Sequence, residues 1–257
     1  MVEMLLESNY KVVTLDNLSG GYREAVIGGE FEYVDLANKP ELERVFKKYQ
    51  FTAVMHFASY IQVGESVIKP AMYYENNVVS TLNLLNVIVK YDVKSFVFSS
   101  TAALFGEPEY TPIDEQHPTN PINPYGRSKL MIEQILADYG KAYNLKSVCL
   151  RYFNAAGADP EGLLGERHVP ETHSIPLILQ ASSKRRECIK VFGRDYGTPD
   201  GTCIRDYIHI VDLCSAHLLA PEKLVKEKNS HTYNLGNGND FSVQEVIYTA
   251  REVTGEK

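Results

Sequence analysis

The sequence predicts an α/β protein with a doubly wound parallel sheet and a smaller second lobe. Strand-like apolar segments alternate with helix-like amphipathic segments from residue 11 to residue 152, which is the pattern of parallel strands joined by crossover helices. Several of the strand-like segments are nearly continuous apolar runs, as strands buried on both faces require. After Gly157 the chain becomes polar, with glycines and prolines, so a second lobe is expected there.

Composition narrows the class of protein. The chain has 257 residues, 44% hydrophobic and 23% charged, with a net charge of −7. This balance is typical of a soluble globular protein and argues against a nucleic-acid partner or an anionic membrane surface. The sequence contains no apolar run of about 20 residues and no signal-peptide pattern. The four cysteines have no metal or redox spacing, so we expect reduced thiols, no metal site and a cytoplasmic location.

In the first 91 residues, the expected elements are a helix over 1–6, strands over 11–15 and 31–36, a helix over 39–49, a strand over 52–58 and a helix over 71–91. His56 lies inside an apolar run, and we expect a packed, hydrogen-bonded histidine because no metal partner has a fitting spacing. The 71–91 helix is apolar on more than one face, so it needs a partner besides the sheet.

The remaining expected elements are a strand over 94–100, a loop over 107–124, a helix over 125–143, a strand over 146–152, a loop over 159–172, a helix over 175–183, strands over 190–193 and 205–210, a helix over 211–226 and a strand over 232–236. Ser242 and Glu245 have the spacing of a capping box, which would open a last helix that ends at Thr254.

Tyr125 and Lys129 are four residues apart, so they project from one face of a helix. A nearby positive charge favours a phenolate. Lowering a tyrosine pKa from ~10 to neutrality takes about 4 kcal/mol, which a lysine and a cationic nicotinamide ring could supply together. The spacing alone is weak evidence, but Thr101 lies at a strand end, where doubly wound sheets present site residues. A purely local cap remains an alternative for Thr101.

Asp16 ends the strand over 11–15. An acid at this place commonly binds the ribose hydroxyls of a dinucleotide, and an Asx-type turn residue is the alternative. The glycine fingerprint of such folds belongs before this strand, and no Gly-x-Gly-x-x-Gly follows a strand in the sequence. We therefore expect that the first strand and the glycine loop are missing from the chain.

These motifs resemble those of the extended short-chain dehydrogenase/reductases, and more narrowly the UDP-glucose 4-epimerase family, along essentially the whole chain. The matching stretches are Leu15–Ser19, His56–Ala58, Val63–Val67, Tyr73–Val78, Ser99–Ala102, Pro124–Lys129, Leu150–Asn154 and Asp200–His209. The last stretch is the most diagnostic, because the related nucleotide-sugar dehydratases look different there. The family's C-terminal segment is also absent, so the chain resembles a fragment that lacks both ends.

The resemblance implies a Rossmann-type NAD-binding domain over residues 1–157. Residues 158–257 would form mainly a UDP-sugar-binding lobe, with some elements returning to the large domain. The cofactor-binding residues would be Asp16, Asn17, Asp35, Leu36, Phe57, Ala58, Ser59, Asn76, Lys129, Tyr152 and Phe153. The substrate-binding residues would be Thr101, Tyr125, Asn154, Lys190, Val191, Phe192 and Arg205. Arg205 suits a diphosphate because its guanidinium binds bidentately, and the alternative is an ion pair with Asp206.

The implied reaction is a reversible, NAD-dependent epimerisation at C4 of a UDP-hexose through a 4-keto sugar. Tyr125 would be the base, Lys129 would bind the nicotinamide ribose and tune Tyr125, and Thr101 would assist. A homodimer would form through the 71–91 and 125–143 helices.

Three alternatives remain. A 4,6-dehydratase would require a carboxylate pair beside Thr101, but Ala102 and Ala103 stand there. A non-catalytic NAD-binding protein would be free to lose Tyr125 or Lys129, but both are present. A truncated, inactive fragment is the third alternative. In that case the strands over 11–15 and 53–58 would lack the strand between them, and we expect weak NAD binding, no turnover and aggregation.

Overall fold

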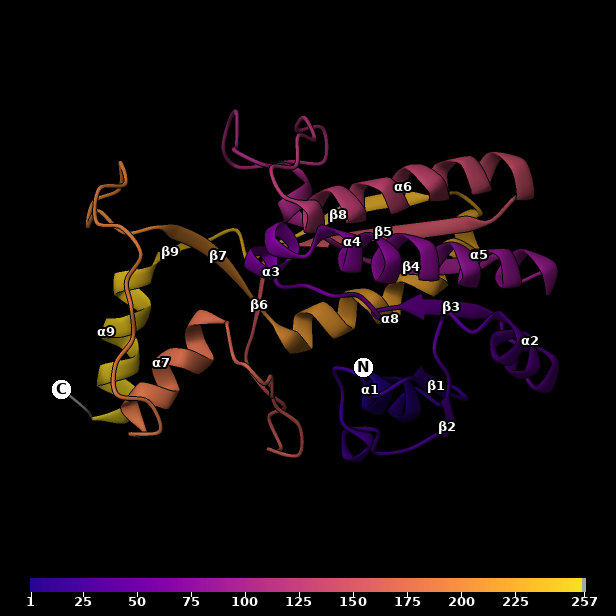
Figure 1. Cartoon of the computed structure of the whole chain (residues 1–257), viewed down its shortest axis with the longest axis horizontal. Helices are drawn as coiled ribbons and strands as arrows, with labels where there is room; N and C mark the ends of the chain where they lie inside the picture. The colour runs from indigo at the N-terminus through magenta and orange to yellow at the C-terminus, as the bar shows by residue number, and fades with distance from the viewer. Residues whose placement is uncertain (256–257) are drawn as a thin grey trace. The chain divides into compact units, whose positions relative to one another are not determined.

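The computed structural model describes residues 1–255, which form two compact units (Figure 1). The first unit comprises Met1–Tyr152 and Leu213–Leu235. The second comprises Phe153–Asp212 and the segment that begins at Gly236. The chain therefore leaves the first unit, returns to it for one helix and one strand, and leaves it again.

All strand pairs of the first unit are parallel, as a doubly wound sheet requires. The strands are β1 (Val13–Asp16), β2 (Glu30–Tyr33), β3 (Ala53–His56), β4 (Ser95–Thr101), β5 (Lys146–Tyr152) and β8 (His231–Leu235). One sheet has the order β3-β4-β5-β8, and β1 pairs with β2 separately. Within residues 1–255, β1 and β3 do not pair with each other, as the sequence predicted for the strands over 11–15 and 53–58.

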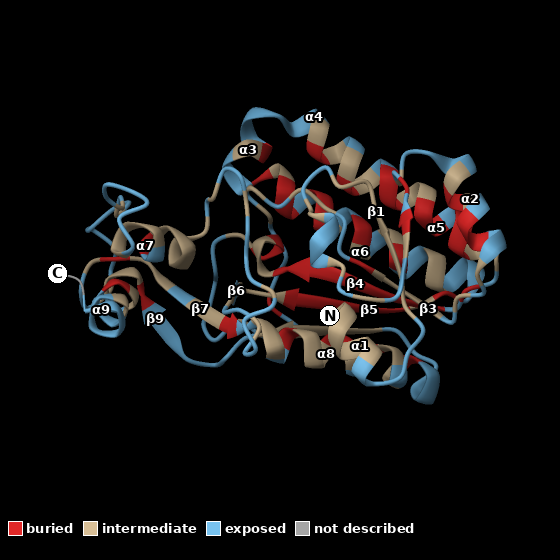
Figure 2. Ribbon diagram, turned by 90° about the horizontal axis from the view of Figure 1, so that it is seen from below, coloured by how far each residue is buried: buried red, intermediate tan, exposed pale blue. Residues whose placement is uncertain are grey.

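Helices cover both faces of the four-stranded sheet, which confirms the predicted fold class (Figures 1 and 2). On one face lie α2 (Lys39–Lys48), α4 (Pro70–Tyr73), α5 (Ser80–Lys90) and α6 (Pro124–Tyr143), and on the other lies α8 (Ile210–Glu227). Side chains of β4 alternate between two cores. Phe96 and Phe98 belong to the core shared with α2, α5 and α6, whereas Val97 packs with Leu224 of α8.

The helix predicted over 71–91 is not regular. A π-helical segment, η2 (Tyr74–Val79), joins α4 to α5. Apolar periodicity could not reveal it, because a π segment adds only one residue to a helix without interrupting the apolar run. The first unit also contains α1 (Val2–Glu7), α3 (Val63–Ile68) and the short 3-10 turns η1 (Arg23–Ala25) and η3 (Ala102–Leu104).

The second unit has a small sheet in the order β6-β7-β9, comprising β6 (Asn154–Ala156), β7 (Ile204–His209) and β9 (Asp240–Ser242). Its two helices, α7 (Ser174–Ser182) and α9 (Val243–Thr254), contact each other. The capping box of α9 is confirmed: Ser242 Oγ accepts from Glu245 N at 3.0 Å, and Glu245 Oε2 accepts from Ser242 N at 2.7 Å.

The strand predicted over 190–193 was wrong, because the structure has an irregular segment there. Phe192 is 81% exposed, and Gly193 has φ of 89°. Two residues of high β propensity, Val191 and Phe192, do not make a strand unless a neighbouring strand pairs with them. The positive φ of Gly193 turns the chain away before a ladder could extend.

Candidate active site

The start of α6 lies against the end of β4, and a glycine makes this approach close enough. A Cβ atom at Gly126 would lie 2.5 Å from the carbonyl oxygen of Ala103, in the turn that follows Thr101. No side chain larger than hydrogen fits there. Gly126 therefore allows its neighbour Tyr125 to come within reach of Thr101, which hydrogen-bonds the Tyr125 hydroxyl.

Lys129 is 1% exposed and links two strand ends. Its Nζ donates to the carbonyl oxygen of Ser99 at 2.7 Å, at the end of β4. It also donates at 2.9 Å to the hydroxyl of Ser59, which follows β3. Burial lowers the pKa of Lys129 to about 7, with the charge of Glu133 opposing the shift. The ammonium lies 5.9 Å from the centroid of the Tyr125 ring, so the predicted pair is brought together.

Tyr125 is 8% exposed, and burial raises its pKa above the ordinary value. The hydrogen bond from Thr101 acts in the opposite direction. The chain's own groups thus leave the phenol protonated at neutral pH. Thr101 also accepts from the backbone N of Ala103 at 3.1 Å. The Thr101 hydroxyl therefore caps a local turn and also contacts the phenol of Tyr125.

Sequence reasoning missed Asn77, which fixes the surroundings of Lys129. Asn77 is 1% exposed; its Nδ2 donates to Tyr60 O at 3.0 Å and to Ser128 Oγ at 3.1 Å, and its Oδ1 accepts from Tyr60 N at 2.8 Å. These bonds join the segment after β3 to α6. The available signal was an amide pair, Asn76 and Asn77, within an otherwise apolar helical run.

A buried ion pair between Glu133 of α6 and Arg151 of β5 was also missed. Arg151 Nη2 lies 2.5 Å from Glu133 Oε2, and both side chains are at most 10% exposed. Ser100 Oγ donates to Glu133 Oε1 at 2.5 Å. The pair therefore ties α6 to β4 and β5 beneath Tyr125 and Lys129. An arginine inside the apolar run of β5 was the available sequence signal.

Asn17 and Asp35, both predicted to bind the cofactor, meet at the ends of β1 and β2. Asn17 Nδ2 donates to Asp35 Oδ2 at 2.8 Å, and Asp35 Oδ1 accepts from the backbone N of Ala37 at 2.7 Å. Asp16 Oδ1 accepts from Leu18 N at 2.6 Å, so one oxygen of this carboxylate forms an Asx-type turn. Leu36 follows Asp35 and packs partly against the main core.

The other predicted cofactor residues follow β3, lie in η2 or end β5. Phe57 is 45% exposed and its ring lies 4.9 Å from that of His217. Ala58 and Ser59 come next, and Asn76 donates to Asn77 Oδ1 at 3.0 Å. The Tyr152 hydroxyl contacts Ser99 Oγ, and Phe153 begins the second unit.

His56 is 3% exposed, and its Nε2 lies 2.8 Å from Thr81 Oγ1. This confirms the expectation of a packed, hydrogen-bonded histidine. Burial lowers the pKa of His56 to about 3, with the Lys129 charge adding to the effect.

The predicted UDP-binding residues belong to the second unit. Asn154 Nδ2 donates to the backbone oxygen of Asp206 at 2.9 Å. Arg205 is exposed, and no ion pair joins it to Asp206 in the described part of the chain. The Asp206 carboxylate instead accepts from Asn237 N at 2.8 Å and Gly238 N at 3.3 Å. Lys190, Val191 and Phe192 lie in the irregular segment.

The second unit also contains a pocket of about 450 Å³ that sequence reasoning did not foresee. Its lining residues are Ala156, Tyr207, Ile208, His209, Asp212, Gly236 and Asn237. Three of these residues, Tyr207, Ile208 and His209, are the last three of the stretch Asp200–His209. A strand that ends in a tyrosine and a histidine was the available signal.

The residues of the first unit fit a nucleotide cofactor. Lys129 is a buried cation whose hydrogen-bond partners, a hydroxyl and a carbonyl, are both neutral. An acid and an amide lie at the ends of β1 and β2, where doubly wound sheets bind nucleotides. The fold and these strand-end groups define a Rossmann-type α/β protein.

Residues 1–236 match the model of the NAD dependent epimerase/dehydratase family, and the chain belongs to this family. It is 51% identical to the UDP-glucose 4-epimerase of Halalkalibacterium halodurans, over 99% of this chain and 76% of that protein. The UDP-glucose 4-epimerase of Rhizobium leguminosarum bv. trifolii is 50% identical, over 97% of this chain and 76% of that protein.

Solved structures agree with these relatives. UDP-glucose 4-epimerase from Brucella ovis, in complex with NAD, has a TM-score of 0.96 at 46% identity, covering 98% of this chain and 77% of that chain. The UDP-glucose 4-epimerase from Bifidobacterium longum, in complex with NAD⁺ and UDP, has a TM-score of 0.92 at 38% identity. The match covers 99% of this chain and 79% of that chain. Among the described residues, no helix is both long and apolar enough to span a membrane.

Proposed function

We propose that this chain is an NAD-dependent UDP-glucose 4-epimerase, an isomerase that interconverts UDP-glucose and UDP-galactose. The observation that carries the proposal is the group of Thr101, Tyr125 and Lys129, gathered at the end of β4 in a chain about half identical to epimerases along nearly its whole length. Bound NAD supplies a reversible hydride acceptor, so the reaction involves no net oxidation.

Positive charge from Lys129 and from the nicotinamide ring of bound NAD⁺ would stabilise Tyr125 as a phenolate. The phenolate would accept the proton of the sugar 4-hydroxyl and return it after the 4-keto sugar has turned over. The Thr101 hydroxyl donates to the Tyr125 oxygen and so favours the phenolate. Lys129 contributes positive charge 5.9 Å from the phenol ring. Its bonds to Ser59 and Ser99 fix the ammonium in place, and the same ammonium binds the nicotinamide ribose.

Each unit contributes a binding function. In the first unit, the cofactor is bound by Asp16, Asn17, Asp35, Leu36, Phe57, Ala58, Ser59, Asn76, Lys129 and Tyr152, with Phe153 following β5. In the second unit, UDP is bound by Asn154, Lys190, Val191, Phe192 and Arg205. The exposed guanidinium of Arg205, which has no carboxylate partner in Asp206, suits a diphosphate.

We also propose a cytoplasmic homodimer that forms through the helices of one face. Val79 of η2 is 52% exposed, and Met131 of α6 is 40% exposed. Helix α6 contacts η2, so these apolar side chains belong to neighbouring helices. Pairing each helix with its copy across a two-fold axis would form a four-helix bundle.

The proposed activity is tested by the conversion of UDP-galactose to UDP-glucose with NAD supplied. Tyr125→Phe should lower turnover by about 10²–10⁴-fold, because it removes the group that transfers the proton. Tyr143→Phe is the matched control, since this tyrosine is 50% exposed at the other end of the same helix. Turnover near the wild-type value in Tyr125→Phe would refute the assignment.

A further inference from the structure

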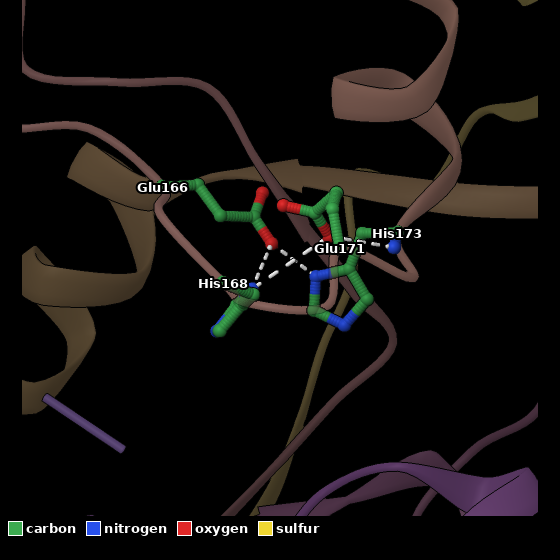
Figure 3. Close-up of side chains that lie close together, drawn as sticks. All are labelled: Glu166, His168, Glu171 and His173. Atoms are coloured by element: carbon green, nitrogen blue, oxygen red, sulfur yellow. Dashed lines mark hydrogen bonds and ion pairs between the residues drawn. The ribbon is translucent and has the colours of Figure 1, made fainter. Parts of the chain in front are cut away.

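The loop between β6 and α7 contains a cluster of side chains that the proposed function does not use. Glu166, His168, Glu171 and His173 lie within eight residues of sequence, and Figure 3 shows their side chains converging. One donor atom from each side chain lies within 4.8 Å of the other three. All four residues belong to the second unit.

Two distances within this cluster are close to those between the donor atoms of a tetrahedral metal site. His168 Nδ1 lies 3.2 Å from Glu166 Oε1 and 3.7 Å from Glu171 Oε1. His173 Nδ1 contacts the same oxygen of Glu166. Zinc bonds of about 2.0–2.2 Å place tetrahedral donor atoms about 3.4 Å from one another. Small movements of the side chains would therefore complete the shell.

The loop has little else to fix its conformation. None of residues 157–173 is buried, and Val169 and Leu163 are 85% and 68% exposed. Apolar contacts thus offset little of the conformational entropy that this segment loses when it is ordered. Polar contacts or a bound ion must therefore stabilise the conformation of this loop.

Glu171 and His173 are already held in place. The Glu171 side chain is 6% exposed, although the residue as a whole is only partly buried. Its carboxylate accepts from the backbone N of Thr172 at 2.7 Å and of His173 at 2.8 Å. His173 is the residue that precedes α7, and the next residue, Ser174, hydrogen-bonds Tyr207 of β7 at 3.1 Å. An ion bound to this cluster would therefore tie the loop to the anchored start of α7.

We propose that Glu166, His168, Glu171 and His173 bind one Zn²⁺ ion, which cross-links this loop to the start of α7. Imidazole nitrogens favour zinc over Mg²⁺ and Ca²⁺, which prefer shells of oxygen atoms. Four protein ligands leave no open position, as in structural zinc sites. The two carboxylates balance the charge of the ion, and the short sequence separations make ring closure inexpensive in entropy. The site does not depend on the proposed epimerase activity.

The first test is zinc titration of the untagged, chelator-treated full chain, followed by calorimetry and metal analysis. One zinc per chain should bind, and Mg²⁺ and Ca²⁺ should not compete. His168→Ala and His173→Ala should each weaken zinc binding by at least about 10–100-fold. Removing a residue that only hydrogen-bonds a metal ligand already costs this much affinity, and each of these variants removes a ligand itself. His231→Ala is the matched control, because this histidine pairs with Glu227 at 3.0 Å in the other unit.

Limited proteolysis of the wild-type chain provides a second readout, which does not require a stable variant. Zinc should slow tryptic cleavage after Arg167, inside the cluster, and leave cleavage after Lys190 unchanged. The proposal is overturned by the absence of saturable zinc binding, by unchanged binding in His173→Ala, or by unchanged cleavage after Arg167. Loss of zinc in Cys188→Ser, with binding retained in His173→Ala, would place the ion at an exposed thiol and would also overturn it.

Discussion

Lys129 carries a cationic side chain into a position that is 1% exposed. Burial disfavours the charged form, and its pKa is lowered from 10.5 to about 7. Between these two values the unfolded chain binds more protons at this residue than the folded chain does. The contribution of Lys129 to the free energy of unfolding therefore rises with pH in this window. Below pH 7 both states are protonated, and the cost of burying the charge is at its maximum.

Replacing Lys129 with methionine should remove this pH dependence. As pH rises from 7 to 9, the free energy of unfolding of Lys129→Met should fall relative to wild type, by up to about 1.4 kcal/mol per pH unit. His56, with a pKa of about 3, does not titrate in this window. Urea unfolding at pH 6, 7, 8 and 9 measures the difference. Lys141→Met, at a side chain 82% exposed on the same helix, is the control. A difference that stays constant for Lys129→Met would contradict the expectation.

At the scale of the element, α6 is the helix on which the proposed chemistry depends. It begins at Asn123, whose Oδ1 accepts from Gly126 N at 2.8 Å, and Asn144 ends it in the left-handed conformation with φ of 57°. These are the usual capping residues at the two ends of a helix. The N-terminal cap fixes the same turn that carries Tyr125.

Asn123→Ala should therefore affect both stability and turnover. Loss of the cap should cost about 1 kcal/mol of unfolding free energy, and the freed first turn should also lower kcat by moving Tyr125 away from Thr101. The control is Ser242→Ala, which removes the cap of α9, a helix that carries none of the proposed catalytic residues. Denaturation and the epimerase assay measure the two effects. Equal losses of kcat in both variants would show that the cap of α6 has no special role.

At the scale of the whole molecule, the proposed dimer can be tested at its apolar surface. Wild type should sediment as a dimer at micromolar concentration. Val79→Asp combined with Met131→Glu should sediment as a monomer, because two negative charges on neighbouring helices would have to be buried without a cationic partner. Val169→Asp is the control, at a side chain 85% exposed in the loop before α7. A monomeric wild type would disprove the proposal.

The sequence predicted those features that local pattern encodes. The alternation of strand-like and helix-like segments was enough to predict the parallel sheet. The spacing of Tyr125 and Lys129 was enough to place them on one helix face. The prediction of a strand over 190–193 was wrong, because a strand needs a neighbouring strand to pair with, and residue propensity does not show whether one is present. The links of Asn77 to Ser128 and of Glu133 to Arg151 join residues 51 and 18 positions apart. Such links arise from tertiary packing, so no local sequence pattern predicts them.

The π-helical segment Tyr74–Val79 has a consequence for how this chain tolerates changes in length. A π turn holds one residue more than the α-helical turn that it replaces. Deleting one residue here would therefore restore a regular helix and leave α4 and α5 in nearly the same rotational register, whereas one extra residue in a helix that stayed regular would rotate one flank by about 100° relative to the other. Tyr73, whose hydroxyl donates to Gln62 O at 2.7 Å, would keep facing its partner. The wider turn thus accommodates one additional residue without turning Tyr73, on one flank, or the core-facing residues of α5, on the other, away from their neighbours.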